Sequence, residues 1–156
     1  MKKITINKKE YTFEYSIEAS LYNECTKSVM DMFIKGGFIQ GEAEQGDTDG
    51  AMNNIIQSIA DIPERALTLF YAGLLEHHGS EGDGSVLSKS DAKKILADFL
   101  KEKKKSFRDV LGEMIELMVK DNFFDLIGLT EIAKETEKEL ENEIPSKDAG
   151  KNTSEK

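Results

Sequence analysis

The chain has 156 residues, of which 38% are hydrophobic and 33% are charged, and its formal net charge is −9. This length suits one domain with a buried core. The negative charge disfavours binding to nucleic acid or to anionic membranes, which attract clusters of Lys and Arg. A single cysteine, Cys25, excludes an internal disulfide. No apolar run approaches the roughly 20 residues that span a bilayer, and no secretory signal opens the chain. We expect a soluble intracellular protein that binds other proteins, and neither nucleic acid nor a membrane.

An alternating pattern near the start of the chain predicts a short β-hairpin over about residues 3–15. Two segments, 3–6 and 10–15, flank a turn-like Asn-Lys-Lys. In the second segment three aromatic residues alternate with polar ones: Tyr11, Phe13 and Tyr15. An isolated hairpin is only marginally stable in water, so its apolar face should rest on helices.

A helix is predicted to follow the hairpin, with Ser16 as its N-cap. Apolar residues then recur every four positions, which places them on one helical face. This face consists of Ile17, Leu21, Cys25, Val29 and Phe33. We predict one continuous helix that buries this face.

The most strongly patterned helix begins near Pro63, with Asp61 as its candidate N-cap. Adjacent apolar pairs recur every four residues between Ala66 and Leu75. Gly79 is expected to end the helix.

Four further helical segments complete the predicted fold. They start at Met52, at Ser88 or Ser90, at Phe107 and at Phe123. The predicted architecture is mainly α, a compact bundle of about six helices with the N-terminal hairpin, and forms one domain over residues 1–143. Residues 144–156 carry no large apolar side chain, so we predict a disordered tail.

The only histidines, His77 and His78, follow Glu76 at the end of the most patterned helix. Adjacent residues point about 100° apart on a helix, so the two rings do not easily share a metal ion. Histidine near a helix C-terminus is favoured by the helix dipole and by unpaired carbonyls. We therefore predict a polar helix end, with a metal-dependent enzyme built on these three residues as the alternative. Cys25 lies on an apolar face, and no glycine-rich phosphate loop is present. We predict no catalytic residue, no cofactor and no metal.

The only basic cluster spans residues 101–105 together with Arg108. It is either a solvated helix end that complements the helix dipole or a contact for an acidic partner surface. We favour the solvated helix end.

Large apolar side chains are dense in two of the predicted helices. They are candidates for core packing or for contact with another protein, and we expect most of them to lie in the core. The set consists of Phe70, Tyr71, Leu74, Leu75, Phe123, Phe124 and Ile127.

Four segments of the chain resemble a known family. They read ITINKKEYTFEYSIEASLYNEC, IPERALTLFYAGLLEHHG, SKSDAKKILADFL and DNFFDLIGL, in this order and over about residues 3–130. Together they resemble the tail assembly chaperones of long-tailed, siphovirus-type bacteriophages or prophages of Gram-positive bacteria. None of the four segments is a catalytic signature. The resemblance rests on all four segments occurring together in this order.

The resemblance implies a protein that is not an enzyme. Members of this family bind the tape measure protein, keep it soluble and help tail tube protein polymerise around it. They act in the cytoplasm of the bacterial host and are absent from the mature virion. Self-association is expected to shield apolar faces between clients. A structural tail component or a small protein-binding adaptor without enzymatic activity is the alternative.

The family often produces a longer protein by a ribosomal frameshift near the end of the short form. Codons for Gly150, Lys151 and Asn152 can contain a slippery A-AAA-AAC run. The gene sequence tests this prediction directly, because synonymous codons would remove the run.

Overall fold

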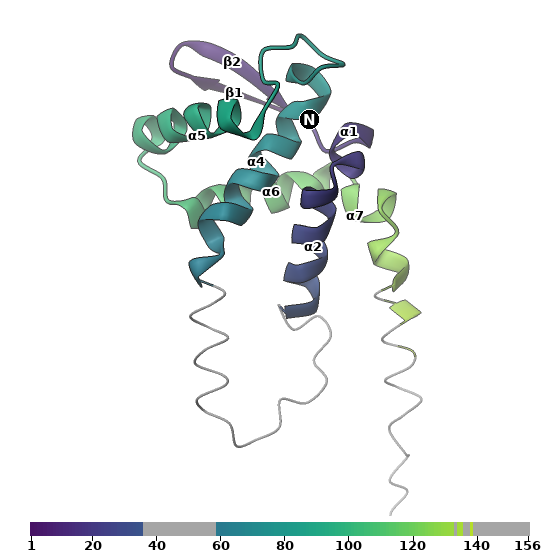
Figure 1. Ribbon diagram of the computed structural model, residues 1–156. Coiled ribbons are helices and arrows are strands. Elements are labelled where there is room, and N and C mark those ends of the chain that lie inside the picture. The colour runs from purple at the N-terminus through teal and green to yellow at the C-terminus, as the bar shows by residue number, and fades with distance from the viewer. Residues whose placement is uncertain (36–58, 133, 136–137, 139–156) are drawn as a thin grey trace, which may run out of the picture.

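The computed structural model describes residues 1–35, 59–132, 134–135 and 138 (Figure 1). Over these residues the fold is mainly α with an N-terminal hairpin, as predicted. The elements in chain order are β1 (Lys2–Ile6), β2 (Lys9–Phe13), α1 (Ile17–Leu21), α2 (Asn23–Lys35), α4 (Ile62–His78), α5 (Lys89–Lys103), α6 (Phe107–Lys120) and α7 (Phe123–Leu126). In this described part, no helix has the length and apolar character needed to cross a membrane. The predicted helix at Met52 and the predicted tail at 144–156 lie outside the described residues.

The hairpin turn is built from Asn7 and Lys8. The strands are antiparallel, with Ile6 opposite Lys9, so only these two residues connect them. Their φ angles are 50° and 66°. Two positive φ values give the turn whose twist matches that of the flanking strands.

The second strand is shorter than predicted, because β2 ends at Phe13 and not at Tyr15. Phe13 pairs with Lys2, the first residue of β1. Beyond it, the N–H of Glu14 donates to the carbonyl of Gly73 in α4 at 2.9 Å. A Cβ atom on Gly73 would lie 3.1 Å from the Phe13 ring. The glycine therefore lets the end of the hairpin lie directly on α4.

The helix predicted after the hairpin is two helices, so that prediction is wrong in this respect. Tyr22 separates α1 from α2 with extended backbone, ψ 98°. Because of this interruption, the apolar residues of α1 do not lie on the same face as those of α2. Cys25 and Val29 of the predicted face are buried, whereas Ile17 and Leu21 are 61% and 70% exposed.

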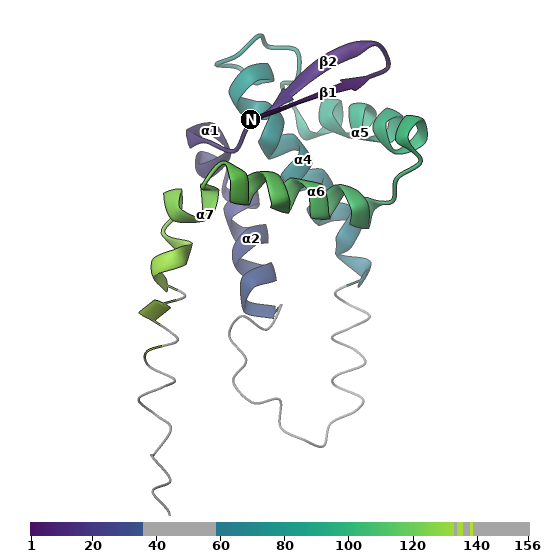
Figure 2. The same cartoon turned by 180° about the vertical axis from the view of Figure 1, so that it is seen from behind.

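The helix α4 is central to the fold. It contacts β2, α1, α2, α5 and α6, and Figure 1 and Figure 2 show it running between α2 and α5. It begins near Pro63 and ends before Gly79, as predicted. Asp61 occupies the N-cap position, but its carboxylate makes no capping hydrogen bond and pairs with Arg65 at 3.5 Å.

The helices α5 and α6 both begin with a reciprocal capping box. The Ser88 side chain accepts from the N–H of Asp91, and the Asp91 carboxylate accepts from the N–H of Ser88. Ser106 and Asp109 repeat the arrangement in α6. Of the two serines predicted to cap α5, Ser88 is therefore the N-cap. Each box satisfies backbone N–H groups that the first helical turn leaves unpaired.

The helical stretch predicted from Phe123 onward is interrupted. α7 ends at Leu126, and Gly128 adopts a left-handed conformation with φ of 74° before helix resumes at residues 129–132. Glycine takes this conformation at little steric cost. The chain therefore changes direction after α7.

The core surrounds α4 and is rich in aromatic contacts. The Phe13 and Phe70 rings meet edge-on with centroids 4.9 Å apart. Phe99 of α5 reaches the same Phe70 ring at 6.0 Å. The buried Tyr15 hydroxyl donates to the carbonyl of Leu69 at 2.7 Å. The hairpin, α4 and α5 thus share one core.

Candidate protein-interaction site

The residues predicted for core packing or protein interaction fall into two groups, one buried and one partly exposed. Three are fully enclosed and inaccessible to a partner: Phe70, Leu74 and Phe123. The other four are partly exposed: Tyr71, Leu75, Phe124 and Ile127. Of these four, Phe124 lines an apolar pocket at the surface.

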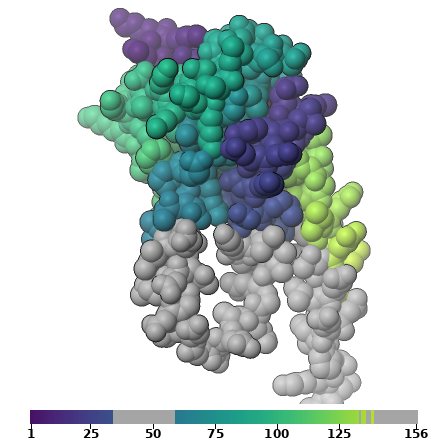
Figure 3. All heavy atoms as spheres, viewed as in Figure 1, coloured from purple at the N-terminus to yellow at the C-terminus, as the bar shows by residue number. Residues whose placement is uncertain are grey.

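This apolar pocket has a volume of about 400 Å³ and lies between α2, α6, α7 and the helical residues that follow α7. Figure 3 shows α2 on the surface beside the C-terminal helical segment. The pocket is lined by Val29, Met32, Phe33, Ile115, Met118, Val119, Phe124, Leu129 and Thr130.

Helical spacing explains why these residues meet. Residues at i, i+3 and i+4 lie together on one helical face, and each long helix contributes such a triplet. The triplets are Val29, Met32 and Phe33 in α2, and Ile115, Met118 and Val119 in α6. The change of direction at Gly128 then places Leu129 and Thr130 at the same pocket.

The pocket offers hydrophobic contact almost exclusively. Among the described residues that line it, Thr130 is the only polar one, and none of these side chains ionises. The thioethers of Met32 and Met118 are flexible and adapt to different apolar shapes. Val119 is 58% exposed, so the pocket is open to solvent. The described lining can bury apolar side chains of another chain and contributes no acidic or basic group.

Most residues that line the pocket are not among those that the sequence predicts for core packing or protein interaction. Periodicity places Val29 and Phe33 on the buried face predicted for the helix after the hairpin, and it gives no role to Met32 or Val119. The available signal is the i, i+3, i+4 spacing of Ile115, Met118 and Val119 in α6.

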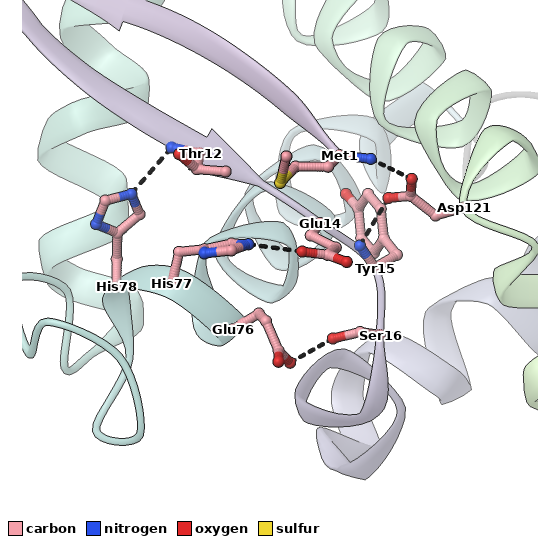
Figure 4. A network of polar contacts seen from close by, with 9 residues as sticks. All are labelled: Met1, Thr12, Glu14, Tyr15, Ser16, Glu76, His77, His78 and Asp121. Carbon is pink, nitrogen blue, oxygen red and sulfur yellow. Dashed lines mark hydrogen bonds and ion pairs between the residues drawn. The ribbon is translucent and has the colours of Figure 1, made fainter.

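The histidine pair lies in the last turn of α4, as predicted, and joins that turn to the hairpin (Figure 4). His77 Nε2 lies 2.6 Å from the Glu14 carboxylate. The backbone N–H of Thr12 donates to His78 Nε2 at 2.9 Å. Figure 4 shows the His78 ring directed toward Thr12 in β2 and the His77 ring directed toward Glu14, which follows β2.

The other ring nitrogen of His78 faces the loop after α4. Its Nδ1 lies 3.0 Å from the Asp83 carboxylate and 3.1 Å from the Ser85 hydroxyl. Hydrogen bonds from the Ser85 side chain and backbone, with a smaller contribution from His78, lower the pKa of Asp83 from 3.8 to about 2. His78 is itself buried, with 6% of its surface exposed. It therefore holds the hairpin and the loop together.

The two rings do not converge on one point, because His77 faces Glu14 while His78 faces Thr12 and Asp83. Among the described residues, no cluster of three or more His, Cys, Asp or Glu side chains is arranged to hold a metal ion. The Cys25 thiol is buried, and desolvation raises its pKa to about 12. It stays protonated at neutral pH and is a poor nucleophile.

The apolar pocket is therefore the feature of the described residues that is best suited to bind another protein. Its described lining comes from residues 29–33 and 115–130, two parts of the chain that are distant in sequence. No family model, curated protein or solved structure matches this chain.

Proposed function

We propose that this protein is a tail assembly chaperone of a long-tailed bacteriophage or prophage of a Gram-positive bacterium. It binds the tape measure protein in the host cytoplasm, keeps it soluble and assists polymerisation of tail tube protein around it. It does not remain in the mature virion. The resemblance over about residues 3–130 supports this proposal, and the open apolar pocket is the structural observation that carries it.

The pocket suits a client that presents apolar side chains from a helix. In helix-in-groove binding, one or two large side chains of the client enter a hydrophobic recess. Burying one Leu or Phe contributes roughly 1.5–3 kcal/mol. Part of this is offset by the loss of freedom on association. One or two such anchors give reversible binding, which allows tube subunits to displace the chaperone.

The charge of the chain fits the same role. At a net charge of −9, the protein carries a negative surface that opposes non-specific aggregation. A client bound through its apolar face would acquire this negative surface. The complex would then resist the aggregation expected of exposed apolar helices.

Co-expression with the tape measure protein tests the proposal. The wild-type chain is expected to raise the soluble fraction of the tape measure protein several-fold. The variant Val119→Asp places a carboxylate at the mouth of the pocket and should lose this effect. Val119 is 58% exposed, so the variant should still fold. The matched control is Leu87→Asp, because Leu87 is 62% exposed and lies outside the pocket lining.

Each experimental outcome tests a different part of the proposal. If the tape measure protein is equally insoluble with and without the wild-type chain, the chaperone role is wrong and the adaptor alternative is favoured. If Val119→Asp protects the client as well as wild type does, the client binds elsewhere on the protein. Mass spectrometry of purified virions addresses the other alternative, because a structural tail component would be present in the particle.

A further inference from the structure

The basic residues of the chain are concentrated in two segments that are distant in sequence. Residues 1–13 and 89–108 hold 12 of the 21 Lys and Arg residues but only 4 of the 30 Asp and Glu residues. These two segments therefore have a net charge of +8 and the rest of the chain has −17, which together give the −9 of the whole chain. The negative charge of the protein thus does not extend to these segments.

The structure places the two basic segments side by side. The strand β1 contacts α5, and Figure 1 and Figure 2 both show the hairpin beside α5. At the hairpin turn, the backbone N–H of Asn7 donates to the carboxylate of Glu102, in the last turn of α5, at 2.7 Å. Lys8 and Lys9, which follow Asn7, therefore lie next to the basic end of α5.

Five positively charged side chains around this contact form a surface that is here called the basic face. It consists of Lys8, Lys9, Lys101, Lys104 and Arg108. All five are exposed, and none of them forms an ion pair within the described part of the chain. Two neighbouring carboxylates are already engaged, because Glu10 pairs with Lys3 and Glu102 pairs with Lys103, each at 2.9 Å. The positive charge of the face is therefore available to a partner.

Local structure fixes where these charges lie. Lys8 adopts a positive φ of 66° in the hairpin turn, and Lys104 is the C-cap of α5 with φ of 50°. The Lys9 ammonium lies 5.1 Å from the centroid of the buried Tyr11 ring, on the side of β2 that faces the helices. Arg108 lies in the first turn of α6. The hairpin turn and the α5–α6 connection thus contribute to one surface.

The composition of the basic face suits carboxylates better than nucleic acid. Four of its five cations are Lys, a point charge, whereas Arg is favoured where phosphate is held by two parallel hydrogen bonds. The exposed carboxylates of Asp98 and Glu102, which are one helical turn apart in α5, would repel closely spaced phosphates. Phe107 is the only exposed aromatic side chain among the described residues, whereas surfaces for single-stranded nucleic acid stack successive bases on several.

We propose that the basic face is a docking site for an acidic segment of a partner protein, whose carboxylates bind between the hairpin turn and the end of α5. Glu102 provides an internal example, because its carboxylate accepts the backbone N–H of the turn. The sequence alone favours a solvated helix end for residues 101–105, and the lysines that the hairpin adds change this interpretation. The proposal does not depend on the proposed function, because the basic face shares no residue with the described lining of the apolar pocket.

The expected contact is electrostatic. Opposite charges on two proteins speed their encounter and fix their relative orientation more than they raise the affinity. Salt screens such exposed charges, so binding should weaken as ionic strength rises. These two properties distinguish the basic face from the apolar pocket, whose contacts are hydrophobic and much less sensitive to salt.

Fluorescence anisotropy with a short, labelled oligoglutamate peptide tests the proposal. Wild type is expected to bind this peptide, more weakly as salt is added, and not to bind a matched oligoglutamine peptide. The hairpin variant Lys8→Glu/Lys9→Glu and the helix variant Lys101→Glu/Lys104→Glu should each bind roughly tenfold more weakly, because each replaces two attractions with two repulsions. The pocket variant Val119→Asp should bind the peptide like wild type, so this result is independent of whether the chaperone role holds.

A third variant controls for net charge. Each reversal changes the charge by two, so the hairpin variant and the helix variant both go from −9 to −13. The control Lys27→Glu/Lys120→Glu also reaches −13, at exposed positions in α2 and at the end of α6 that leads to α7. Figure 2 shows both places away from the hairpin turn and the α5–α6 connection. The control should therefore bind the peptide like wild type.

Circular dichroism checks that each variant folds. If a charge reversal prevents folding, the neutral replacements Lys8→Gln/Lys9→Gln and Lys101→Gln/Lys104→Gln take its place, with a smaller but measurable loss of affinity.

The proposal is wrong if wild type does not bind the oligoglutamate peptide, or if the control loses as much affinity as the other two variants. Loss in only one of the hairpin and helix variants would also overturn it, because the proposed face needs both segments. A single-stranded oligonucleotide with the same number of charges is the last comparison. If it binds more tightly than the peptide and loses affinity in the same variants, the partner is nucleic acid and not an acidic protein.

Discussion

The backbone N–H of Thr12 in β2 donates a hydrogen bond to Nε2 of His78, the last residue of α4, at 2.9 Å. A backbone N–H can only donate, so Nε2 must be the nitrogen without a proton. The proton of the neutral ring then lies on Nδ1 and faces Asp83 and Ser85. One side chain therefore connects the hairpin, α4 and the following loop.

Replacing His78 should destabilise the protein measurably. In His78→Leu the N–H of Thr12 loses its acceptor in a partly buried position, which costs about 1–3 kcal/mol. His78→Gln should lose less, because its side-chain carbonyl can accept from Thr12. Urea unfolding followed by circular dichroism measures the difference. His77→Leu is the matched control, since His77 is about one-third exposed and should cost less. Equal losses for His78→Leu and His77→Leu would contradict this assignment.

Asp83 should contribute stability that depends on pH. Its pKa is lowered from 3.8 to about 2, chiefly by hydrogen bonds from Ser85. Because the folded pKa is below the unfolded one, the contribution is present above about pH 4 and is lost as pH falls toward 2. The side chain is 53% exposed, so screening limits the contribution to under about 1 kcal/mol.

The measurement is the urea midpoint of wild type and Asp83→Asn between pH 5 and pH 2. The difference in stability should shrink across this window. Asp91 and Asp109, whose pKa values are also lowered by hydrogen bonds from capping serines, are present in both proteins and cancel in the comparison. A difference that stays constant with pH would show that Asp83 does not titrate as described.

Cys25 should be protected from modification in the folded protein. Burial raises its pKa from 9.0 to about 12, so the thiolate fraction at pH 8 falls roughly a thousandfold. Reaction with a chromogenic disulfide reagent should therefore be slow in buffer and fast in urea. Cys25 is the only cysteine, so the signal reports one site. Complete labelling of the native protein within seconds would contradict the burial.

Two helical glycines should respond oppositely to alanine. At Gly112 in α6, an added Cβ meets no atom within 4 Å. Gly112→Ala should therefore stabilise the protein by about 0.5–1 kcal/mol through helix propensity. At Gly73 the added Cβ would lie 3.1 Å from Phe13 and 3.2 Å from Tyr15. Gly73→Ala should lower the unfolding midpoint, and a stabilised Gly73→Ala would mean that the hairpin does not lie directly on α4.

The hairpin and α4 were predictable because their signals are local. Alternating aromatic residues mark β2, while Pro63 and Gly79 mark the ends of α4. The break at Tyr22 has no such mark, because neither glycine nor proline is present there. The Tyr22 ring meets Tyr71 of α4 edge-on at 5.3 Å, so a contact distant in sequence accompanies the interruption.

The candidate site was less predictable than the fold. Periodicity identifies the apolar faces of α2 and α6 but not their relative placement. Whether Val119 is covered depends on where Phe33 and Leu129 lie, and that follows from the breaks at Tyr22 and Gly128. A pocket formed by α2 together with residues 115–130 is therefore a property of the tertiary structure.

The contact of the hairpin with Gly73 and His78 also bears on the order of events during synthesis. The hairpin leaves the ribosome about sixty residues before its docking surface does, because Thr12 and His78 are 66 residues apart. A two-stranded hairpin has little stability of its own in water. Its aromatic face must therefore stay unburied until α4 emerges. Nascent chains arrested before α4 has left the ribosome should expose Phe13 and Tyr15 to proteases, and chains long enough for α4 to have emerged should protect them.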